Sequence, residues 1–194
     1  QGRITRVHPE TRRVDLNDGR SLAYDWLVIA SGTQPHPDLV PGLADPAIWH
    51  ATIPDPTGAT AFDFYTLPGA TALRAALAAF DGGRILVHIA EMPIKCPIAP
   101  LEFAFLADDY FRGRRIRHKT DISYVTPLDG AFTKPVASAA LGSLLDDRSI
   151  RLVTDFAVSQ VDPRGKQLVS HDGRALPFDL LVTVAPNMGA QFVI

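Results

Sequence analysis

The sequence predicts an α/β fold in which helices pack on a doubly wound parallel sheet with an inserted antiparallel hairpin. The composition is that of a globular protein, with 46% hydrophobic and 21% charged residues over 194 positions. Apolar strand-like runs and helix-like runs alternate through the middle of the chain in a β-α-β-α-β order. A hairpin-and-strand pattern also occurs twice. Together these observations favour one complete α/β domain and part of another.

The repeat is the most informative of the three observations. "VHPETRRVDLNDGRSLAYDWLVIASG" from Val7 aligns without gaps on "VDPRGKQLVSHDGRALPFDLLVTVAPN" from Val161, at a constant offset of 154. Each copy predicts two strands, a tight Asp-Gly-Arg turn and a buried return strand, because Asp-Gly supplies the positive φ of a hairpin turn. The return strands are "DWLVIAS" and "DLLVTVA". Two unrelated hairpins with the same turn chemistry are the alternative.

The elements between the two copies follow from their spacing. A segment with six prolines over residues 33–59 predicts an irregular connector. After it, small apolar residues at helical spacing and short apolar runs alternate. They predict helices at 68–80, 99–113 and 134–147, and strands at 84–90, 121–127 and 150–156.

Several stretches together resemble one family of flavoproteins. "AYDWLVIASG" resembles the strand that closes the flavin domain of FAD-dependent pyridine nucleotide-disulfide oxidoreductases. "PIKCPIAPLEFAF", "TPLDGAFTKPVASAALGSLL" and "FDLLVTVAPNMGAQFVI" are similar to the branch that holds sulfide:quinone oxidoreductase and flavocytochrome sulfide dehydrogenase. The resemblance covers nearly the whole chain and implies a Rossmann-like fold.

The resemblance also implies a domain organisation. Residues 1–45 would be a partial strip of the FAD domain, 46–64 a connector, and 65–183 an inserted NAD-binding-like domain, with 184–194 returning toward the FAD domain. The chain opens with Gln1 in what reads as a strand, and the G-x-G-x-x-G that holds the FAD diphosphate is absent. We therefore expect an internal fragment that is inactive alone and retains no FAD.

The activity implied by the resemblance is oxidation of sulfide or a related sulfur compound through FAD, with a quinone or a cytochrome as electron acceptor. The alternatives are an NAD(P)H-dependent flavoprotein dehydrogenase and a non-catalytic Rossmann-like domain. The implied location is the cytoplasm or the membrane periphery, with the periplasm as a further option. Membrane contact would come only from regions outside this chain.

Cys96, the single cysteine, lies between a predicted strand and a predicted helix. The positive end of a helix dipole and the adjacent Lys95 would both favour the thiolate, which is the nucleophilic form. In the resembled family the matching cysteine takes up sulfane sulfur beside the flavin, so the resemblance implies a catalytic role for Cys96. A small buried structural cysteine is the alternative. A complete cycle normally needs a partner cysteine, and this chain has none.

The turn around Cys96 contains no glycine. A nicotinamide nucleotide needs close backbone approach at this turn, and Ala90, Met92 and Ile94 carry side chains there. We therefore expect no NAD(P)H binding. In contrast, Ala30, Ser31 and Gly32 match the family's A-x-G at the end of the flavin-domain strand, where small residues let the backbone run close to FAD. The alternative is that Gly32 only ends a strand.

Other candidate sites are weaker. A net charge of −2 and a pI near 6.3 argue against a nucleic-acid binder. No histidines have metal-ligand spacing, so we expect no metal site. The basic run "RGRRIRHK" from Arg112 could face anionic lipid or nucleic acid, but the end of a solvated helix explains it better. Asp108 and Asp109 are adjacent and make a poor acid/base pair.

Overall fold

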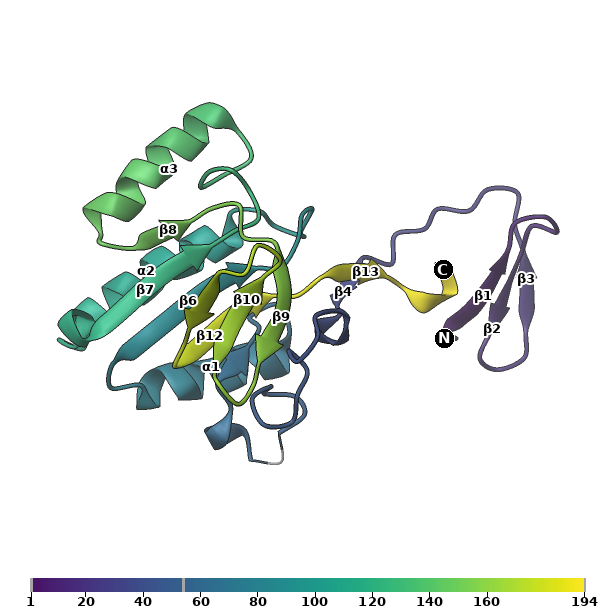
Figure 1. Ribbon diagram of the computed structural model, residues 1–194. Helices are drawn as coiled ribbons and strands as arrows, with labels where there is room; N and C mark the ends of the chain where they lie inside the picture. Colours follow the sequence, from purple (N-terminus) through teal and green to yellow (C-terminus); the bar gives the residue numbers. More distant parts are fainter. Residues whose placement is uncertain (1, 54, 194) are drawn as a thin grey trace. The chain divides into compact units, whose positions relative to one another are not determined.

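The computed structural model describes residues 2–53 and 55–193, so the strand expected at Gln1 lies outside the described residues. The chain divides into two compact units (Figure 1). Unit 1 comprises Gln1–Gln34 and Asn187–Ile194, and unit 2 comprises Pro35–Pro186. Unit 2 contains the parallel sheet, and unit 1 contains the first copy of the hairpin repeat.

The core of unit 2 is a five-stranded sheet in the order β5-β12-β6-β7-β8. Every neighbouring pair in it is parallel, which confirms the predicted α/β sheet. The short hydrogen-bonded strands follow the apolar runs of the sequence, because strands covered on both faces are apolar at successive positions. The strands are β5 (Ala61–Phe62), β6 (Gly83–Ile89), β7 (Thr120–Val125), β8 (Arg151–Val153) and β12 (Leu180–Val184).

The two faces of this sheet are buried by different partners. Along β6, Ile85, Val87 and Ile89 face a cluster formed with the helices α1, α2 and α3. The alternating residue Leu86 belongs to a second cluster, with Phe156 and other residues of the opposite face. The helices are α1 (Leu67–Ala79), α2 (Ala99–Gly113) and α3 (Pro135–Asp147), close to their predicted bounds.

Both copies of the repeat form the two predicted strands, and a short third strand after the Asp-Gly turn, which the sequence did not predict, completes a three-stranded antiparallel sheet in each. The Asp-Gly turns match as well, with φ values of 83° at Gly19 and 87° at Gly173. The second copy packs on the sheet through Val161 and Leu168, which lie in the same cluster as Leu86. The strands are β1 (Ile4–His8), β2 (Arg13–Leu16) and β3 (Ser21–Ala23) in the first copy, and β9 (Val158–Asp162), β10 (Gln167–Ser170) and β11 (Ala175–Pro177) in the second.

The return strand predicted for residues 25–31 is wrong. These residues form no strand, and Trp26 and Val28 are 93% and 87% exposed. The matching run in the second copy does form β12, because β5 and β6 flank it and bond to both of its edges. Unit 1, in its described part, offers no such neighbours, and an apolar run without neighbours gains nothing from an extended strand.

The proline-rich connector is irregular, and a few of its apolar residues are buried. Ile48 and Trp49 are 1% and 3% exposed, and Trp49 forms an isolated bridge with Ala61 of β5, a strand that the sequence did not predict.

β4 (Thr33–Pro35) and β13 (Asn187–Gly189) form a further two-stranded pair. No helix in the described part of the chain is long and apolar enough to cross a membrane. The 3-10 turns are η1 (Pro37–Leu39), η2 (Pro56–Gly58), η3 (Arg117–Lys119) and η4 (Gln191–Val193).

Candidate functional site

Cys96 lies in the turn that joins the carboxyl end of β6 to α2. The carboxyl ends of parallel strands are where α/β proteins form their binding sites. Cys96 is exposed, and its carbonyl oxygen accepts a hydrogen bond from the backbone N–H of Ala99 at 3.1 Å. Ala99 opens α2, and no side chain caps this helix start. A reactant in solution can therefore reach the thiol.

The residues near Cys96 in the sequence differ in burial. Ile94 and Leu101 are buried at 8% and 0% exposure, whereas Ile98 is 39% exposed. Lys95 is exposed and forms no ion pair among the described residues. The turn therefore presents an exposed cysteine, with one exposed lysine beside it in the sequence.

Tyr65 is the neighbour that sequence analysis missed. Its hydroxyl donates a hydrogen bond to the carbonyl oxygen of Cys96 at 3.1 Å, across 31 positions of sequence. Burial, together with the negative charge of an ionised Cys96, holds the pKa of Tyr65 above its usual value. The hydroxyl therefore keeps its proton at neutral pH and remains a donor. No spacing rule links the two positions, so only the fold brings them together.

A buried network fixes the segment that carries Tyr65. Asp63 accepts hydrogen bonds from the backbone N–H of Thr66 at 2.7 Å and pairs with Nε2 of His50 at 2.9 Å. Burial would raise the pKa of Asp63, but the bonds with His50 and Thr66 outweigh it and the pKa is lowered. Thr66 in turn caps α1 by accepting from the N–H of Gly69 at 3.0 Å. The Tyr65 ring is thus tied to the start of α1.

Ala30, Ser31 and Gly32 belong to unit 1, whereas Cys96 belongs to unit 2. All three are exposed, and they form no strand. Gly32 has φ of 69°, and a Cβ added there would meet no atom within 4 Å. The backbone at this point is therefore open, and the assignment of these residues to FAD stays a prediction.

The remaining polar groups do not form a metal centre. Within residues 2–53 and 55–193, no three His, Cys, Asp or Glu side chains could hold a metal ion together. His88 is fully buried in the sheet, where its Nδ1 bonds with the hydroxyl of Thr183 at 2.9 Å. Its role is structural, because it lies 1% exposed beneath Phe156.

Comparison with known proteins finds similar chains, although no family model matches. The mitochondrial sulfide:quinone oxidoreductase of Mus musculus is 24% identical over 200 residues, which cover 100% of this chain and 42% of the relative. The Schizosaccharomyces pombe protein of the same name is 22% identical over 98% of this chain and 41% of its own length. The solved sulfide:quinone oxidoreductase of Aquifex aeolicus superposes with a TM-score of 0.73 at 19% identity, covering 99% of this chain and 43% of that one.

This chain resembles the sulfide:quinone oxidoreductases along its whole length. The resemblance seen in the sequence motifs is therefore confirmed, as is the Rossmann-like α/β fold. The chain spans about two-fifths of the length of these relatives, whose remaining residues have no counterpart in it.

Proposed function

We propose that this chain is part of an FAD-dependent oxidoreductase that oxidises sulfide or a related sulfur compound, with a quinone or a cytochrome as electron acceptor. The observation that carries the proposal is the exposed Cys96 at the head of α2, beyond the carboxyl end of a central strand. The whole-length similarity to sulfide:quinone oxidoreductases supports it. The protein would work in the cytoplasm or at the membrane periphery, with the periplasm as the alternative.

In the proposed step the Cys96 thiolate and HS⁻ form an S–S bond. The S–H bond of HS⁻ breaks, its proton passes to solvent, and two electrons leave, so that a persulfide anion remains on Cys96. FAD, when bound, supplies a two-electron acceptor that can be reoxidised by a quinone or a cytochrome. An exposed, deprotonated sulfur is the reactive form that this step requires.

Other residues have supporting roles, each within its own unit of the chain. Tyr65 fixes the backbone carbonyl of Cys96, and so restricts the turn from which the thiol projects. Ala30, Ser31 and Gly32 are the proposed cofactor contacts, since their small side chains leave the backbone accessible. Fixing a nucleophile relative to its acceptor lowers the entropic part of the barrier.

The test is sulfide-dependent turnover by a flavin-loaded protein that contains this chain. Sulfide added without oxygen should bleach the flavin absorbance, and a soluble quinone should restore it. Parallel assays with cytochrome c would separate the two classes of acceptor. A flavin that sulfide leaves oxidised, but that NADH bleaches, would refute the proposal and favour a pyridine-nucleotide enzyme.

A further inference from the structure

The far end of α2 carries a cluster of arginines around one buried carboxylate. Asp108 is 0% exposed and accepts hydrogen bonds from Nε of Arg117 at 2.5 Å, Nε of Arg112 at 2.8 Å and Nη1 of Arg148 at 3.2 Å. Burial would raise the pKa of Asp108, but the bonds from these arginines lower it more. One negative charge therefore faces three positive charges, and the cluster retains an excess of positive charge.

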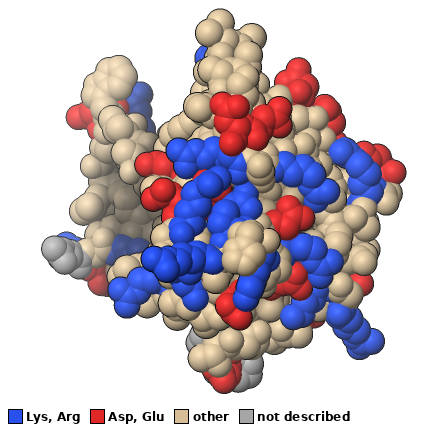
Figure 2. Space-filling model, turned by 90° about the vertical axis from the view of Figure 1, so that its left-hand side faces the viewer, with Lys and Arg blue, Asp and Glu red and all other residues tan. Residues whose placement is uncertain are grey.

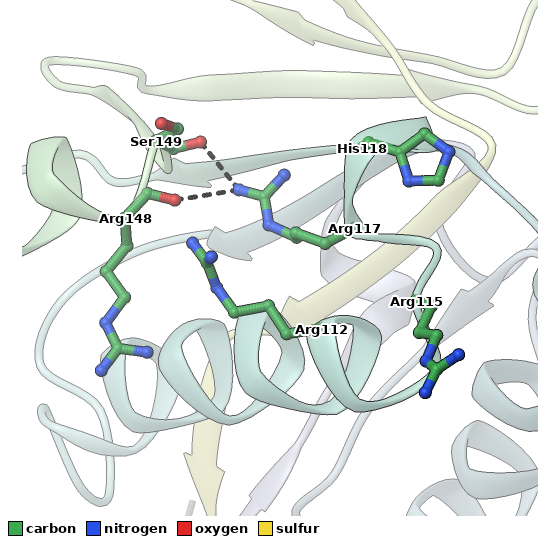
Figure 3. Close-up of a pocket in the computed structure, with 6 residues that line it drawn as sticks. All are labelled: Arg112, Arg115, Arg117, His118, Arg148 and Ser149. Carbon is green, nitrogen blue, oxygen red and sulfur yellow. Dashed lines mark hydrogen bonds between the residues drawn. The ribbon is translucent and has the colours of Figure 1, made fainter.

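The excess charge surrounds a shallow, open surface pocket of about 530 Å³, lined by basic residues and one serine. Figure 2 views the molecule from this side and shows Lys and Arg side chains gathered on its surface. In Figure 3, Arg112 and Arg117 extend from the end of α2 and the following loop toward residues 148 and 149. The lining residues are Arg112, Arg115, Arg117, His118, Arg148 and Ser149.

The arginines of this pocket are not equivalent. Arg117 is 16% exposed and is committed to the fold, since it also donates to the carbonyl oxygens of Thr120, Arg148 and Ser149. Arg112 and Arg148 are 51% and 44% exposed, and each uses only one nitrogen on Asp108 among the described contacts. The remaining guanidinium N–H groups of Arg112 and Arg148 have no protein acceptor in the described part of the chain.

Neighbouring charges offset the excess only in part, because Asp108 and, to a smaller extent, the negative charge of Asp109 act on Arg112 and raise its pKa. Arg115 lines the pocket and forms no ion pair with any described residue. Asp109, the next acid on α2, is exposed and likewise has no ion pair in the described residues. Like charges brought together repel one another, and a bound anion would relieve that repulsion.

We propose that this pocket binds a phosphate-class anion, either a soluble phosphate compound or a phospholipid headgroup. Guanidinium groups match the geometry of phosphate oxygens, and Asp108 already orients those of Arg112 and Arg148. The cavity falls within the usual size of small-ligand sites. α2 has 15 residues at about 1.5 Å each, so the pocket lies roughly 22 Å from the Cys96 turn. The proposal is therefore independent of the proposed sulfur chemistry.

The first experiment is calorimetric titration of the 194-residue chain with inorganic pyrophosphate at low ionic strength. The wild-type chain should bind it saturably, and Arg148→Gln should weaken binding about tenfold, because a hydrogen bond to a charged group contributes roughly that factor. Arg115→Gln should weaken it too without touching Asp108. Arg164→Gln removes the same charge from an exposed turn outside the pocket and should leave binding unchanged.

The second experiment measures sedimentation with vesicles of phosphatidylcholine, with and without phosphatidylserine. Loss of vesicle binding in Arg115→Gln and Arg148→Gln, but not in Arg164→Gln, would identify the lipid headgroup as the ligand. Pyrophosphate binding without vesicle binding would identify a soluble phosphate compound. The proposal is overturned if the wild-type chain binds neither pyrophosphate nor the vesicles saturably. It is also overturned if Arg164→Gln weakens binding as much as the pocket variants do. Circular dichroism of each variant confirms that it is folded.

Discussion

The hydroxyl of Tyr65 donates a hydrogen bond to the carbonyl oxygen of Cys96 at 3.1 Å. The bond joins the residue before the cap of α1 to the turn before α2, so it links the starts of two helices that share one face of the sheet. Tyr65 also contacts Phe64, which stacks on Phe103 of α2 with ring centroids 5.4 Å apart. The position of the Cys96 turn therefore depends on packing as well as on its own sequence.

Tyr65→Phe removes this hydrogen bond and keeps the ring. We expect the free energy of unfolding in urea to fall by about 1 kcal/mol, the usual net value of one hydrogen bond. Alkylation of Cys96 by iodoacetamide should change in rate, because the turn is less restricted. Tyr110→Phe is the matched control, since the Tyr110 hydroxyl has no hydrogen bond among the described contacts. Equal stability of both variants would show that the bond contributes nothing.

Asp108→Asn leaves three arginines without their shared counter-charge. We expect a loss of roughly 3–5 kcal/mol in the free energy of unfolding, as for other buried pairs that lose one partner. Arg117 accounts for most of the loss, because it is the least exposed of the three. Asp109→Asn, at the neighbouring exposed position, should change stability by less than about 0.5 kcal/mol. Chemical denaturation of both variants compares them directly, and similar losses would contradict the assigned role of Asp108.

His88 predicts an acid-dependent loss of stability. Its burial lowers the pKa of the imidazole to about 3 from 6.5, so between these values the unfolded chain binds a proton that the folded chain does not. The free energy of unfolding should therefore fall as pH drops from about 6.5 toward 3, by up to about 1.4 kcal/mol per pH unit from this group.

The His88 prediction is tested by the slope of the free energy of unfolding against pH, with each value obtained from urea denaturation. His88→Asn keeps a polar atom near Thr183 and removes the titration, so it should show a shallower slope whatever its absolute stability. His171→Asn, at an exposed position, should keep the wild-type slope. If the free energy of unfolding depends on pH equally in the wild type and in His88→Asn, then His88 is not a buried neutral imidazole in the folded chain.

The turn after β6 predicts that NADH does not bind this chain. Ala90 and Ile94 are buried at 7% and 8% exposure, and the backbone N–H of Ala90 is bonded to the carbonyl oxygen of Val184 at 3.0 Å. Fluorescence titration with NADH should show no saturation. Saturable micromolar binding that is lost in Ala90→Phe would contradict this and support the dehydrogenase alternative.

Local patterns in the sequence predicted most of unit 2. α2 has its predicted bounds of 99–113, because apolar residues at helical spacing coincide there with the burial of one helix face. The same kind of reasoning failed for residues 25–31, although their sequence is nearly that of β12. The difference lies in the neighbours: β12 bonds to β5 and β6, and residues 25–31 bond to no strand in the described structure.

The site could be predicted only in part. Cys96 stays a predicted site residue, singled out because it is the single cysteine and lies between a strand and a helix. Tyr65 was missed because its contact spans 31 positions, and Asp108 was judged only as half of a poor acid/base pair. Its partner Arg148 is 40 positions away, at the end of a different helix. Contacts of this length follow from the order of the strands, which no local pattern reveals.

The most direct test of the account is sulfide oxidation by a flavin-loaded protein that contains this chain with Cys96→Ser. The account predicts that the variant keeps its flavin absorbance and its fold but loses sulfide oxidation. It also predicts that the wild-type protein treated with sulfide gains one sulfur atom on the Cys96 peptide by mass spectrometry. A Cys96→Ser protein that oxidises sulfide at the wild-type rate would contradict the central claim and leave Cys96 only a structural role.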